Sequence, residues 1–349
     1  MKKAWKIAGF WLRLVAFALV LVITLNYTVY VLTPKYDYGI CPISNYYKQP
    51  ENSIDVLVLG TSCGYAGVNT NVLWEEYGLA VYNLCCAEQP YWVTYYYLVE
   101  ALKTQQPKLI LLDLKASIYT DDYSKRGRTI LSTYGIRDPK VRLEAIAACV
   151  AEEDYLGFAL AFPELHSYYA KVEKENFIYP PTNAGRGPDW KGFIENTKHS
   201  EHEPPSVVWS NTQKKINDRE MEYFEKTLAL ANEYEIPVLL VGFPLPDYAH
   251  DHQYYNTMYA KGKEYGAAGV NYNDPYLQIG LLYSKHFADW QHLNVEGSVI
   301  FSRYLGNDLR TMFDLPDRRG EETYETWQRC ADDWYEKYPQ YRPETEVKQ

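Results

Sequence analysis

Three short apolar runs limit the fold of this chain more than any other feature of its sequence. They cover residues 54–59, 79–84 and 108–113. Apolar runs of this length are typical of strands that are buried on both faces of a parallel sheet. The stretches between them, 72–77 and 91–103, have the pattern of helices. Strands and helices that alternate with short links predict a parallel sheet with helices on both faces.

The alternation stops after residue 117 and resumes near residue 213. The interrupting segment, 117–212, is rich in proline, glycine, histidine and charge, and it predicts an insertion with one helix near 141–150. We expect part of it, 179–209, to overhang the carboxyl ends of the strands and to shape a substrate groove. The pattern then predicts a helix, a strand, a helix, a strand and a closing helix at 213–234, 236–242, 254–265, 269–272 and 295–313.

These segments predict one large α/β domain over 54–315, with a five-stranded parallel sheet. The chain has 349 residues, of which 47% are hydrophobic, so it can bury a core of that size. The charged and aromatic extension at 316–349 is expected to hold one helix that packs on the domain.

The N-terminal segment predicts a membrane anchor. Residues 14–32 are largely apolar and, together with 8–11, reach the ~20 residues that a helix needs to cross a bilayer. Basic residues stand in front of this segment, so the positive-inside rule predicts a cytoplasmic N-terminus and an extracytoplasmic remainder. The segment ends in tyrosines without a small-x-small site, which favours an uncleaved signal anchor over a cleaved signal peptide. We therefore expect an anchor over 1–32, a stalk over 33–53 and a single-pass location in the cell membrane.

Charge and composition narrow the class of partner. The chain carries 35 Lys and Arg against 45 Asp and Glu, a net charge of -10. An acidic chain does not favour a nucleic-acid backbone as partner, and we expect none. No G-x-x-x-x-G-K-[ST] or G-x-G-x-x-G motif is present, so no nucleotide cofactor is expected. The 35 tyrosines and 9 tryptophans are interpreted mainly as packing residues, with stacking on sugar rings as the alternative.

The end of the first predicted strand carries a candidate nucleophile. Gly60 follows the apolar run and can adopt backbone angles that other residues avoid, so Ser62 can be presented at the carboxyl end of a central strand. If a helix begins here, its first free N–H groups lie beside the hydroxyl and can form an oxyanion site. The alternative is a strand-to-helix turn in which Thr61 or Ser62 serves only as an N-cap.

A candidate base stands in the segment before the last predicted helix. Asp289 precedes His292 by three residues, so its carboxylate can orient the imidazole through Nδ1 and leave Nε2 to take a proton from a serine hydroxyl. The alternative is a solvated loop histidine with Asn294 as a helix cap. His286 is a weaker candidate base because no acid lies three residues before it.

Two histidine pairs and one cysteine offer competing chemistry. His199 and His202, like His250 and His252, could be metal ligands, but neither pair has a clear third ligand. We expect solvated loop histidines and no metal site. The thiol of Cys63, next to the candidate serine, should point away from the site if the hydroxyl points into it.

These motifs resemble those of the SGNH/GDSL hydrolase superfamily. Gly-Thr-Ser at 60–62, Asp-x-x-His-Leu-Asn-x-x-Gly at 289–297 and the five-strand pattern between them carry the resemblance, which covers most of the α/β domain apart from the insertion. Within the superfamily the chain is similar to membrane-anchored cell-envelope members, such as the D-alanyl-transfer protein of teichoic acid synthesis and the alginate-type O-acetylation proteins. The resemblance implies a flavodoxin-like three-layer α/β/α fold, with Ser62 as nucleophile, His292 as base and Asp289 as its partner.

The chain departs from the superfamily at the oxyanion hole. Secreted members complete this hole with a glycine after the second strand and an asparagine after the third, and the corresponding stretches here, 83–89 and 113–117, hold neither. The resemblance therefore leaves the N–H of Ser62 and one donor from the stretch after the second strand. The candidates for that donor are Asn83, Cys85, Cys86, Ala87 and Gln89. A hole that lacks one donor loses roughly a hundredfold or more in rate.

The residues and the resemblance together imply a membrane-anchored, extracytoplasmic serine esterase or acyltransferase. It would move a small acyl group, acetyl in the first instance, to or from a cell-envelope polysaccharide or teichoic-acid-like polymer through an acyl-Ser62 intermediate. A multispanning membrane-bound acyltransferase is a candidate partner. The sequence leaves hydrolysis and transfer open. The alternative from another class is a non-catalytic carbohydrate-binding or assembly subunit that keeps the fold.

Overall fold

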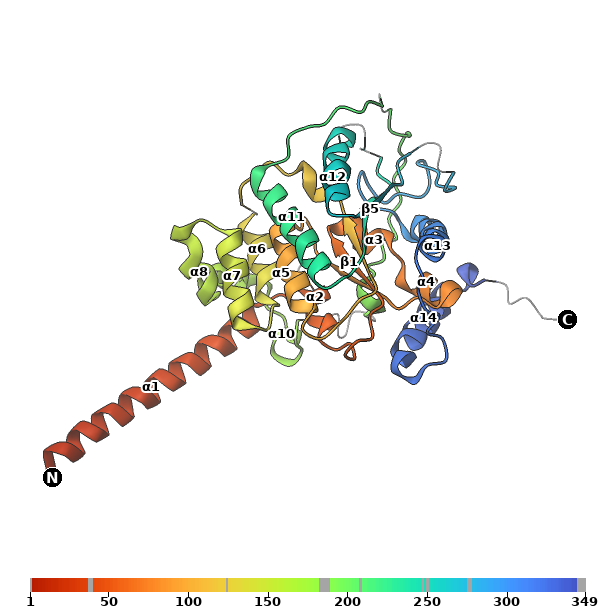
Figure 1. Cartoon of the computed structure of the whole chain (residues 1–349). Coiled ribbons are helices and arrows are strands. Elements are labelled where there is room, and N and C mark those ends of the chain that lie inside the picture. Colours follow the sequence, from red (N-terminus) through yellow and green to blue (C-terminus); the bar gives the residue numbers. More distant parts are fainter. Residues whose placement is uncertain are drawn as a thin grey trace.

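A five-stranded parallel sheet forms the centre of the molecule (Figure 1). The computed structural model describes residues 2–36, 40–123, 125–181, 189–206, 209–246, 248, 251–274 and 278–343. The strands are β1 (Val56–Gly60), β2 (Val81–Cys85), β3 (Leu109–Asp113), β4 (Val238–Gly242) and β5 (Ala268–Asn271). Their order is β2-β1-β3-β4-β5, and every neighbouring pair is parallel. The predicted α/β fold with a five-stranded parallel sheet is confirmed, and the strand order is that of flavodoxin-like sheets.

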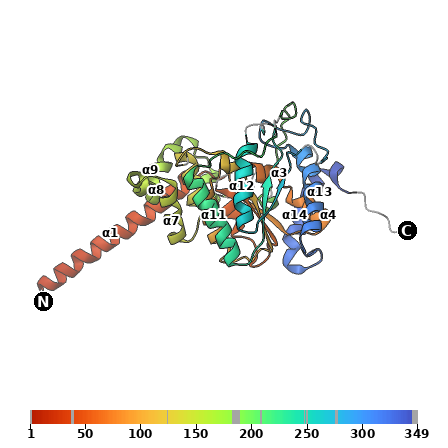
Figure 2. The same ribbon diagram turned by 45° about the horizontal axis from the view of Figure 1, so that its top comes forward.

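Helices cover both faces of this sheet, and Figures 1 and 2 show them as two outer layers. One layer holds α5 (Tyr91–Ala101), α11 (Asp218–Glu233) and α12 (His252–Glu264). The other holds α3 (Ser62–Gly67), α4 (Thr70–Tyr77), α13 (Val295–Met312) and α14 (Glu325–Lys337). The four strands β1 to β4 are buried along their whole length, as strands between two helical layers must be.

The strand order fixes where a site can form. From β1 the chain crosses to β2 on one side, whereas from β3 it crosses to β4 on the other. The topological switch point therefore lies at the carboxyl ends of β1 and β3, where open α/β sheets bind their ligands. Ser62 follows β1 at this point, and Asp113 ends β3 beside it.

The insertion after β3 is more helical than its sequence predicts. It contains α6 (Arg126–Tyr134), α7 (Pro139–Cys149), α8 (Tyr155–Leu160), α9 (Phe162–Leu165) and α10 (Glu175–Ile178), with the 3-10 turns η1 (Lys115–Ile118) and η3 (His166–Lys171). Further along, the N–H of Ile194 donates to the carbonyl of Tyr65 at 2.9 Å, and the N–H of Ser200 donates to that of Phe287 at 3.0 Å. The described end of the predicted overhang thus lies against α3 and the segment before α13, while 182–188 falls outside the described residues.

The C-terminal extension belongs to the folded body. Its helix α14 packs on α4, where the rings of Trp74 and Trp327 lie 6.5 Å apart. The indole N–H of Trp74 also donates to Gln328 Oε1 at 3.0 Å. The sequence predicts one helix in this extension that packs on the domain, and α14 is such a helix.

The segment between the anchor and β1 is not a free stalk. Residues 41–46 form α2 (Cys41–Tyr46), which packs on β2. The hydroxyl of Tyr46 donates to the carbonyl of Ala101, and the hydroxyl of Tyr82 donates to that of Pro42, each at 2.8 Å. Buried tyrosines with satisfied hydroxyls tie this segment to the sheet.

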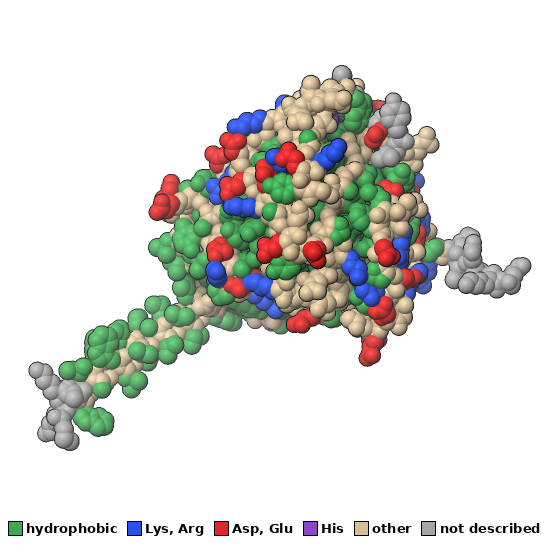
Figure 3. All heavy atoms as spheres, in the orientation of Figure 1, with side chains coloured by type: hydrophobic (Ala, Val, Ile, Leu, Met, Phe, Trp, Pro, Cys, Tyr) green, Lys and Arg blue, Asp and Glu red, His purple; other side chains and the backbone are tan. Residues whose placement is uncertain are grey.

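Helix α1 (Lys2–Leu32) extends away from the body and is coated with hydrophobic side chains (Figures 1 and 3). Among the described residues one helical stretch, Ile7–Leu32, is long and apolar enough to cross a membrane, with a mean hydropathy of 2.3. That stretch of 26 residues exceeds the ~20 that a spanning helix needs.

Candidate active site

The turn after β1 is fixed by a buried carboxylate. Gly60 has φ +147°, and a Cβ on this residue would overlap the side chain of Asp113. Asp113 Oδ2 accepts hydrogen bonds from the N–H and the hydroxyl of Thr61 at 2.9 and 2.5 Å, and Oδ1 accepts from the N–H of Lys115 at 2.9 Å. Burial raises the pKa of Asp113, and these hydrogen bonds oppose the rise. Helix α3 then begins at Ser62 with Thr61 as its N-cap.

Ser62, His292 and Asp289 lie in one hydrogen-bonded row. The Oγ of Ser62 is 2.7 Å from His292 Nε2, and His292 Nδ1 is 2.8 Å from Asp289 Oδ2. With the ring proton on Nδ1 directed at the carboxylate, Nε2 is free to accept the serine hydroxyl proton. The geometry is the one that the residue spacing predicts.

Asp289 is held as a carboxylate. Its Oδ1 accepts the N–H groups of Gln291 and His292 at 2.8 and 3.0 Å. Partial burial acts to raise the pKa of Asp289, but the hydrogen bonds from the imidazole and the backbone outweigh it and lower the pKa to about 2. The carboxylate is therefore ionised at neutral pH.

The segment that carries the base is closed on itself. A β-bridge joins Phe287 to Leu293, and the N–H of Ala288 donates to the carbonyl of His292 at 2.8 Å. Asn294 caps α13 by accepting from the N–H of Gly297 at 2.9 Å, the capping role considered from the sequence. A short loop tied at both ends can hold Asp289 and His292 in one orientation.

The two competing groups have other environments. His286 is buried; its Nδ1 accepts the N–H of Leu282 at 2.9 Å, and its Nε2 lies 3.6 Å from Glu296. Burial lowers the pKa of His286, and its contacts lie outside the Ser62–His292–Asp289 row. The Sγ of Cys63 is buried and directed at the carbonyl of Gln291 at 3.6 Å, and burial raises the pKa of this thiol to about 12. A thiol that stays protonated is a poor nucleophile.

Most of the candidate oxyanion donors are occupied. The side-chain amide of Asn83 donates to the carbonyl of Val68 at 2.8 Å, and that of Gln89 donates to Thr94 Oγ1 at 2.8 Å. The N–H of Cys86 donates to the carbonyl of Gly60 at 3.1 Å and to Gln89 Oε1 at 2.9 Å.

Two backbone donors remain for an oxyanion. Cys85 lies in β2 opposite Gly60, so its backbone belongs to the sheet ladder. The N–H groups of Ser62 and Ala87 have no acceptor among the described residues. These two groups are the backbone donors that remain among the described candidates.

The histidine pairs differ from expectation. His202 and His252 are buried, so the expectation of solvated side chains is wrong for both. Aromatic neighbours cover these imidazoles. The ring of His202 lies 4.3 Å from that of Trp290, and the ring of His252 lies 6.2 Å from that of Trp209. His199 is exposed and its Nε2 contacts the carbonyl of Ser284 at 3.0 Å. His250 falls outside the described residues, among which no group of three metal-binding side chains occurs.

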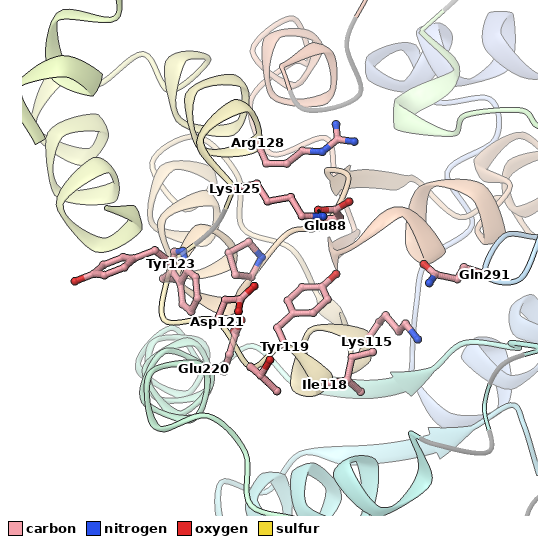
Figure 4. Close-up of a pocket in the computed structure, with 13 residues that line it drawn as sticks. Glu88, Lys115, Ile118, Tyr119, Asp121, Tyr123, Lys125, Arg128, Glu220 and Gln291 are labelled. Atoms are coloured by element: carbon pink, nitrogen blue, oxygen red, sulfur yellow. Dashed lines mark hydrogen bonds and ion pairs between the residues drawn. The ribbon is translucent and has the colours of Figure 1, made fainter. Parts of the chain in front are cut away.

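A cavity of about 310 Å³ lies next to the segment that carries the candidate base (Figure 4), and Ser62, His292 and Asp289 are not among the described residues that line it. Gln291, the neighbour of the candidate base, lines one end, and Glu220 of α11 lines the other, with Lys115 and Tyr119 between them in the view. The remaining walls come from the turn after β2 and from the start of the insertion: Glu88, Pro90, Trp92, Ile118, Thr120, Asp121, Tyr123, Lys125 and Arg128. No described residue of 179–209 lines it, so the described part of that segment does not shape this cavity as the sequence predicts for the groove.

Sequence reasoning missed the polar groups that shape this cavity. Lys115 forms a buried ion pair with Asp251 at 2.6 Å, and Asp113 holds the turn that carries Ser62. A charged residue that ends an apolar run, as Asp113 does, was the available signal. Glu220 lies more than 100 residues further along the chain, on a helix whose other polar residues are mostly exposed, so no local pattern distinguishes it.

Glu220 is a buried acid in the cavity wall. Its Oε2 accepts the N–H of Tyr91 at 2.8 Å, while Oε1 has no hydrogen-bond partner among the described residues. Burial raises the pKa of Glu220 to about 8, only partly opposed by the Tyr91 N–H and by Arg219. The side chain is therefore largely protonated at neutral pH and can donate a hydrogen bond into the cavity.

Glu220→Gln is expected to stabilise the protein above pH 5. The folded-state pKa of about 8 exceeds the ordinary value of 4.5, so between these values the unfolded chain releases a proton that the folded chain retains. Stability then falls as the pH rises, by up to ~1.4 kcal/mol per pH unit, and levels off above pH 8. Thermal denaturation of the full chain in detergent at several pH values should show that the gain in Tm grows from pH 5 to pH 8.

The control for this titration is Glu222→Gln on the same helix. Glu222 is exposed and pairs with Lys226 at 2.6 Å, so its replacement should shift Tm little at any pH. If Glu220→Gln and the native chain lose Tm in parallel from pH 5 to pH 8, the buried carboxyl does not titrate as described.

A scan against protein-family models and searches of curated proteins and of solved structures found no match for this chain. What the fold and the site define is therefore a class: an α/β protein with a five-stranded parallel sheet and a Ser–His–Asp row at the carboxyl edge of that sheet.

Proposed function

We propose that this protein is a membrane-anchored serine esterase or acyltransferase that acts outside the cytoplasm. The observation that carries the proposal is the 2.7 Å contact between Ser62 Oγ and His292 Nε2, with Asp289 on the Nδ1 side. The resemblance to SGNH/GDSL hydrolases supports it, because the same three residues occur there in the same chain order. The exposed apolar helix α1 and the basic residues at its start support the anchored topology.

In the first half of the reaction, the Ser62 hydroxyl would attack the carbonyl carbon of an ester. His292 takes the hydroxyl proton at Nε2, and Asp289 stabilises the imidazolium that forms. When the tetrahedral adduct collapses, the bond to the leaving alcohol breaks and the imidazolium returns the proton to the alcohol oxygen. The product is an acyl-Ser62 ester and a free alcohol.

In the second half, an acceptor hydroxyl attacks the acyl-Ser62 ester while His292 again takes the proton. The bond between the acyl carbon and Ser62 Oγ then breaks, and the imidazolium returns the proton to the serine oxygen. Water as acceptor gives hydrolysis, and a sugar hydroxyl gives transfer. The oxyanion formed in each half would be stabilised by the N–H groups of Ser62 and Ala87. With two donors in place of three, we expect a slower acyl transfer than in a complete hole, by roughly a hundredfold or more.

The cavity that Gln291 lines, next to the candidate base in the chain, suits a carbohydrate acceptor. Tyr119 and Tyr123 offer ring surface for stacking, and Glu88 and Asp121 offer acceptors for hydroxyl groups. An extracytoplasmic position favours a cell-envelope polysaccharide or a teichoic-acid-like polymer as substrate. A multispanning acyltransferase in the same membrane would be the partner that supplies acyl groups.

A serine-reactive fluorophosphonate probe tests the proposal. The hydroxyl of Ser62 is expected to form a covalent adduct with the probe because His292 can remove its proton as the bond to phosphorus forms. Labelling of the purified full chain should disappear in Ser62→Ala. In-gel fluorescence and mass spectrometry of the labelled peptide provide the measurement.

Ser284→Ala is the matched control. Ser284 is exposed on the segment that leads to the base and lies outside the hydrogen-bonded row, so labelling should persist in this variant. A folded native chain that takes up no probe would instead favour a non-catalytic carbohydrate-binding or assembly subunit, and the occupied amides of Asn83 and Gln89 would then explain the weak site.

A further inference from the structure

Exposed apolar side chains gather in one part of the body. Outside α1, seven of the fourteen large hydrophobic residues with strong exposure among the described residues lie within 156–179. Those that matter here are Leu156, Leu160, Phe162, Tyr169, Phe177 and Ile178, with exposed fractions from 38% to 74%. Figure 3 shows hydrophobic side chains over α7 and α8 beside the base of α1. A contiguous apolar surface on a globular body marks an interaction site.

This surface surrounds the place where α1 enters the body. Helices α9 and α10 and the turn η3 contact α1, and the side-chain amide of Asn176 donates to the carbonyl of Val31 at 2.8 Å. A groove of about 250 Å³ between α1 and the insertion is lined by Val22 and Leu25 on one side and by Phe158 and Leu160 on the other. The anchor and the exposed apolar residues therefore form one continuous surface.

The length of α1 places this surface at the edge of a bilayer. Counted from Ile7, where the apolar span begins, the ~20 residues that cross the ~30 Å hydrocarbon core end near Asn26. Val22, Leu25 and Asn26 line the groove that the insertion shares with α1. The apolar side chains of α8 and α9 thus lie at the depth where acyl chains give way to headgroups.

Charge does not explain this surface. Glu152 and Glu153 precede α8, and Asp154 and Glu164 pair with Arg126 at 2.7 and 2.6 Å. The exposed lysines of this surface, Lys171 and Lys174, alternate with Glu173 and Glu175, so basic residues are not in excess among the described residues here. A polybasic segment would bind anionic headgroups, whereas this surface presents apolar side chains. Its binding energy would come from burial of apolar side chains and would not require anionic lipid.

We propose that the surface formed by α8, α9, η3 and α10, here called the collar, is embedded in the leaflet at which α1 ends. This proposal depends on the membrane anchoring that is part of the proposed function, but it does not depend on the proposed catalysis. Embedding removes the apolar side chains from water and fixes the tilt of the body on its anchor. In Figures 1 and 2 the base of α1 and helix α13, which follows the candidate base, lie on opposite sides of the body. The collar would therefore hold the candidate site away from the bilayer surface.

Spin labels on the full chain in nanodiscs of zwitterionic phosphatidylcholine test the collar. The labels are placed by Leu156→Cys and Ile178→Cys in a chain in which Cys41 and the partly exposed Cys330 are replaced by serine, whereas Cys63, Cys85, Cys86 and Cys149 are buried and are kept. Oxygen concentrates in the bilayer and a nickel chelate stays in water. At both positions the ratio of collision rates, oxygen over nickel chelate, is expected to be severalfold higher than at control positions.

Three further labels make the outcome decisive. Leu282→Cys and Met312→Cys are exposed apolar positions outside the insertion and should give low, water-like ratios. Val20→Cys reports on α1 itself. A bilayer-type ratio at Val20 with water-like ratios at Leu156 and Ile178 overturns the collar and leaves the anchor standing. Water-like ratios at all positions overturn the anchor as well. Apart from the scaffold protein at its rim, the purified nanodisc holds no second protein, so a collar made for a protein partner also gives water-like ratios.

Discussion

Replacing Ser62 or His292 by alanine is expected to reduce turnover of an acetyl ester by roughly ten-thousand-fold or more in each case. The hydroxyl and the imidazole are in contact at 2.7 Å, so each loses its catalytic use when the other is removed. The double variant should therefore be hardly slower than either single one. Asp289→Asn should cost less, because the base stays in place while its orientation and charge stabilisation weaken. Steady-state hydrolysis of a chromogenic acetyl ester measures all four variants.

His199→Ala serves as the control for these losses. His199 is exposed, and its ring contacts a carbonyl outside the candidate row. Its replacement should leave turnover close to that of the native chain, and circular dichroism should show equal folding in every variant. Turnover retained in Ser62→Ala, or losses that multiply in the double variant, would mean that the two residues do not act as one unit.

The sheet could be predicted because its signal is local. The run at 56–59 is apolar throughout and buried at every position, as a strand between two helical layers requires. The insertion could not be predicted in the same way. Its helices α8, α9 and α10 have four to six residues each, too short for an apolar stripe to repeat. The helix α2 in the expected stalk has only six residues, so it could not be predicted for the same reason.

In the candidate site, too, the contacts that follow from local spacing could be predicted, and those that depend on tertiary structure could not. Asp289 and His292 lie three residues apart, so their contact follows from local spacing, and the contact with Ser62 follows from the order of strands. The oxyanion donors depend on tertiary contacts that no local pattern contains: the amide of Gln89 turns to Thr94, and that of Asn83 turns to Val68. The kinship with SGNH/GDSL hydrolases stays a prediction.

Gly60→Ala is expected to destabilise the protein by several kcal/mol and to abolish turnover. A Cβ at this position would overlap Asp113, whose carboxylate is fixed by Thr61 and Lys115, so neither side can move without breaking buried hydrogen bonds. The backbone angle of +147° adds strain, since residues with a side chain rarely adopt it. Because Ser62 follows this turn by two residues, any shift of the turn also displaces the hydroxyl from His292. Thermal denaturation and ester turnover measure the two effects.

Gly266→Ala separates packing from backbone strain. Gly266 also has a positive φ, +77°, but a Cβ there would meet no atom within 4 Å. Only the conformational cost of ~1 kcal/mol then applies, and turnover should be unchanged because the position lies before β5, away from the carboxyl edge of the sheet. If the two variants lower Tm equally, backbone strain alone accounts for Gly60, and the contact with Asp113 does not hold the turn that presents Ser62.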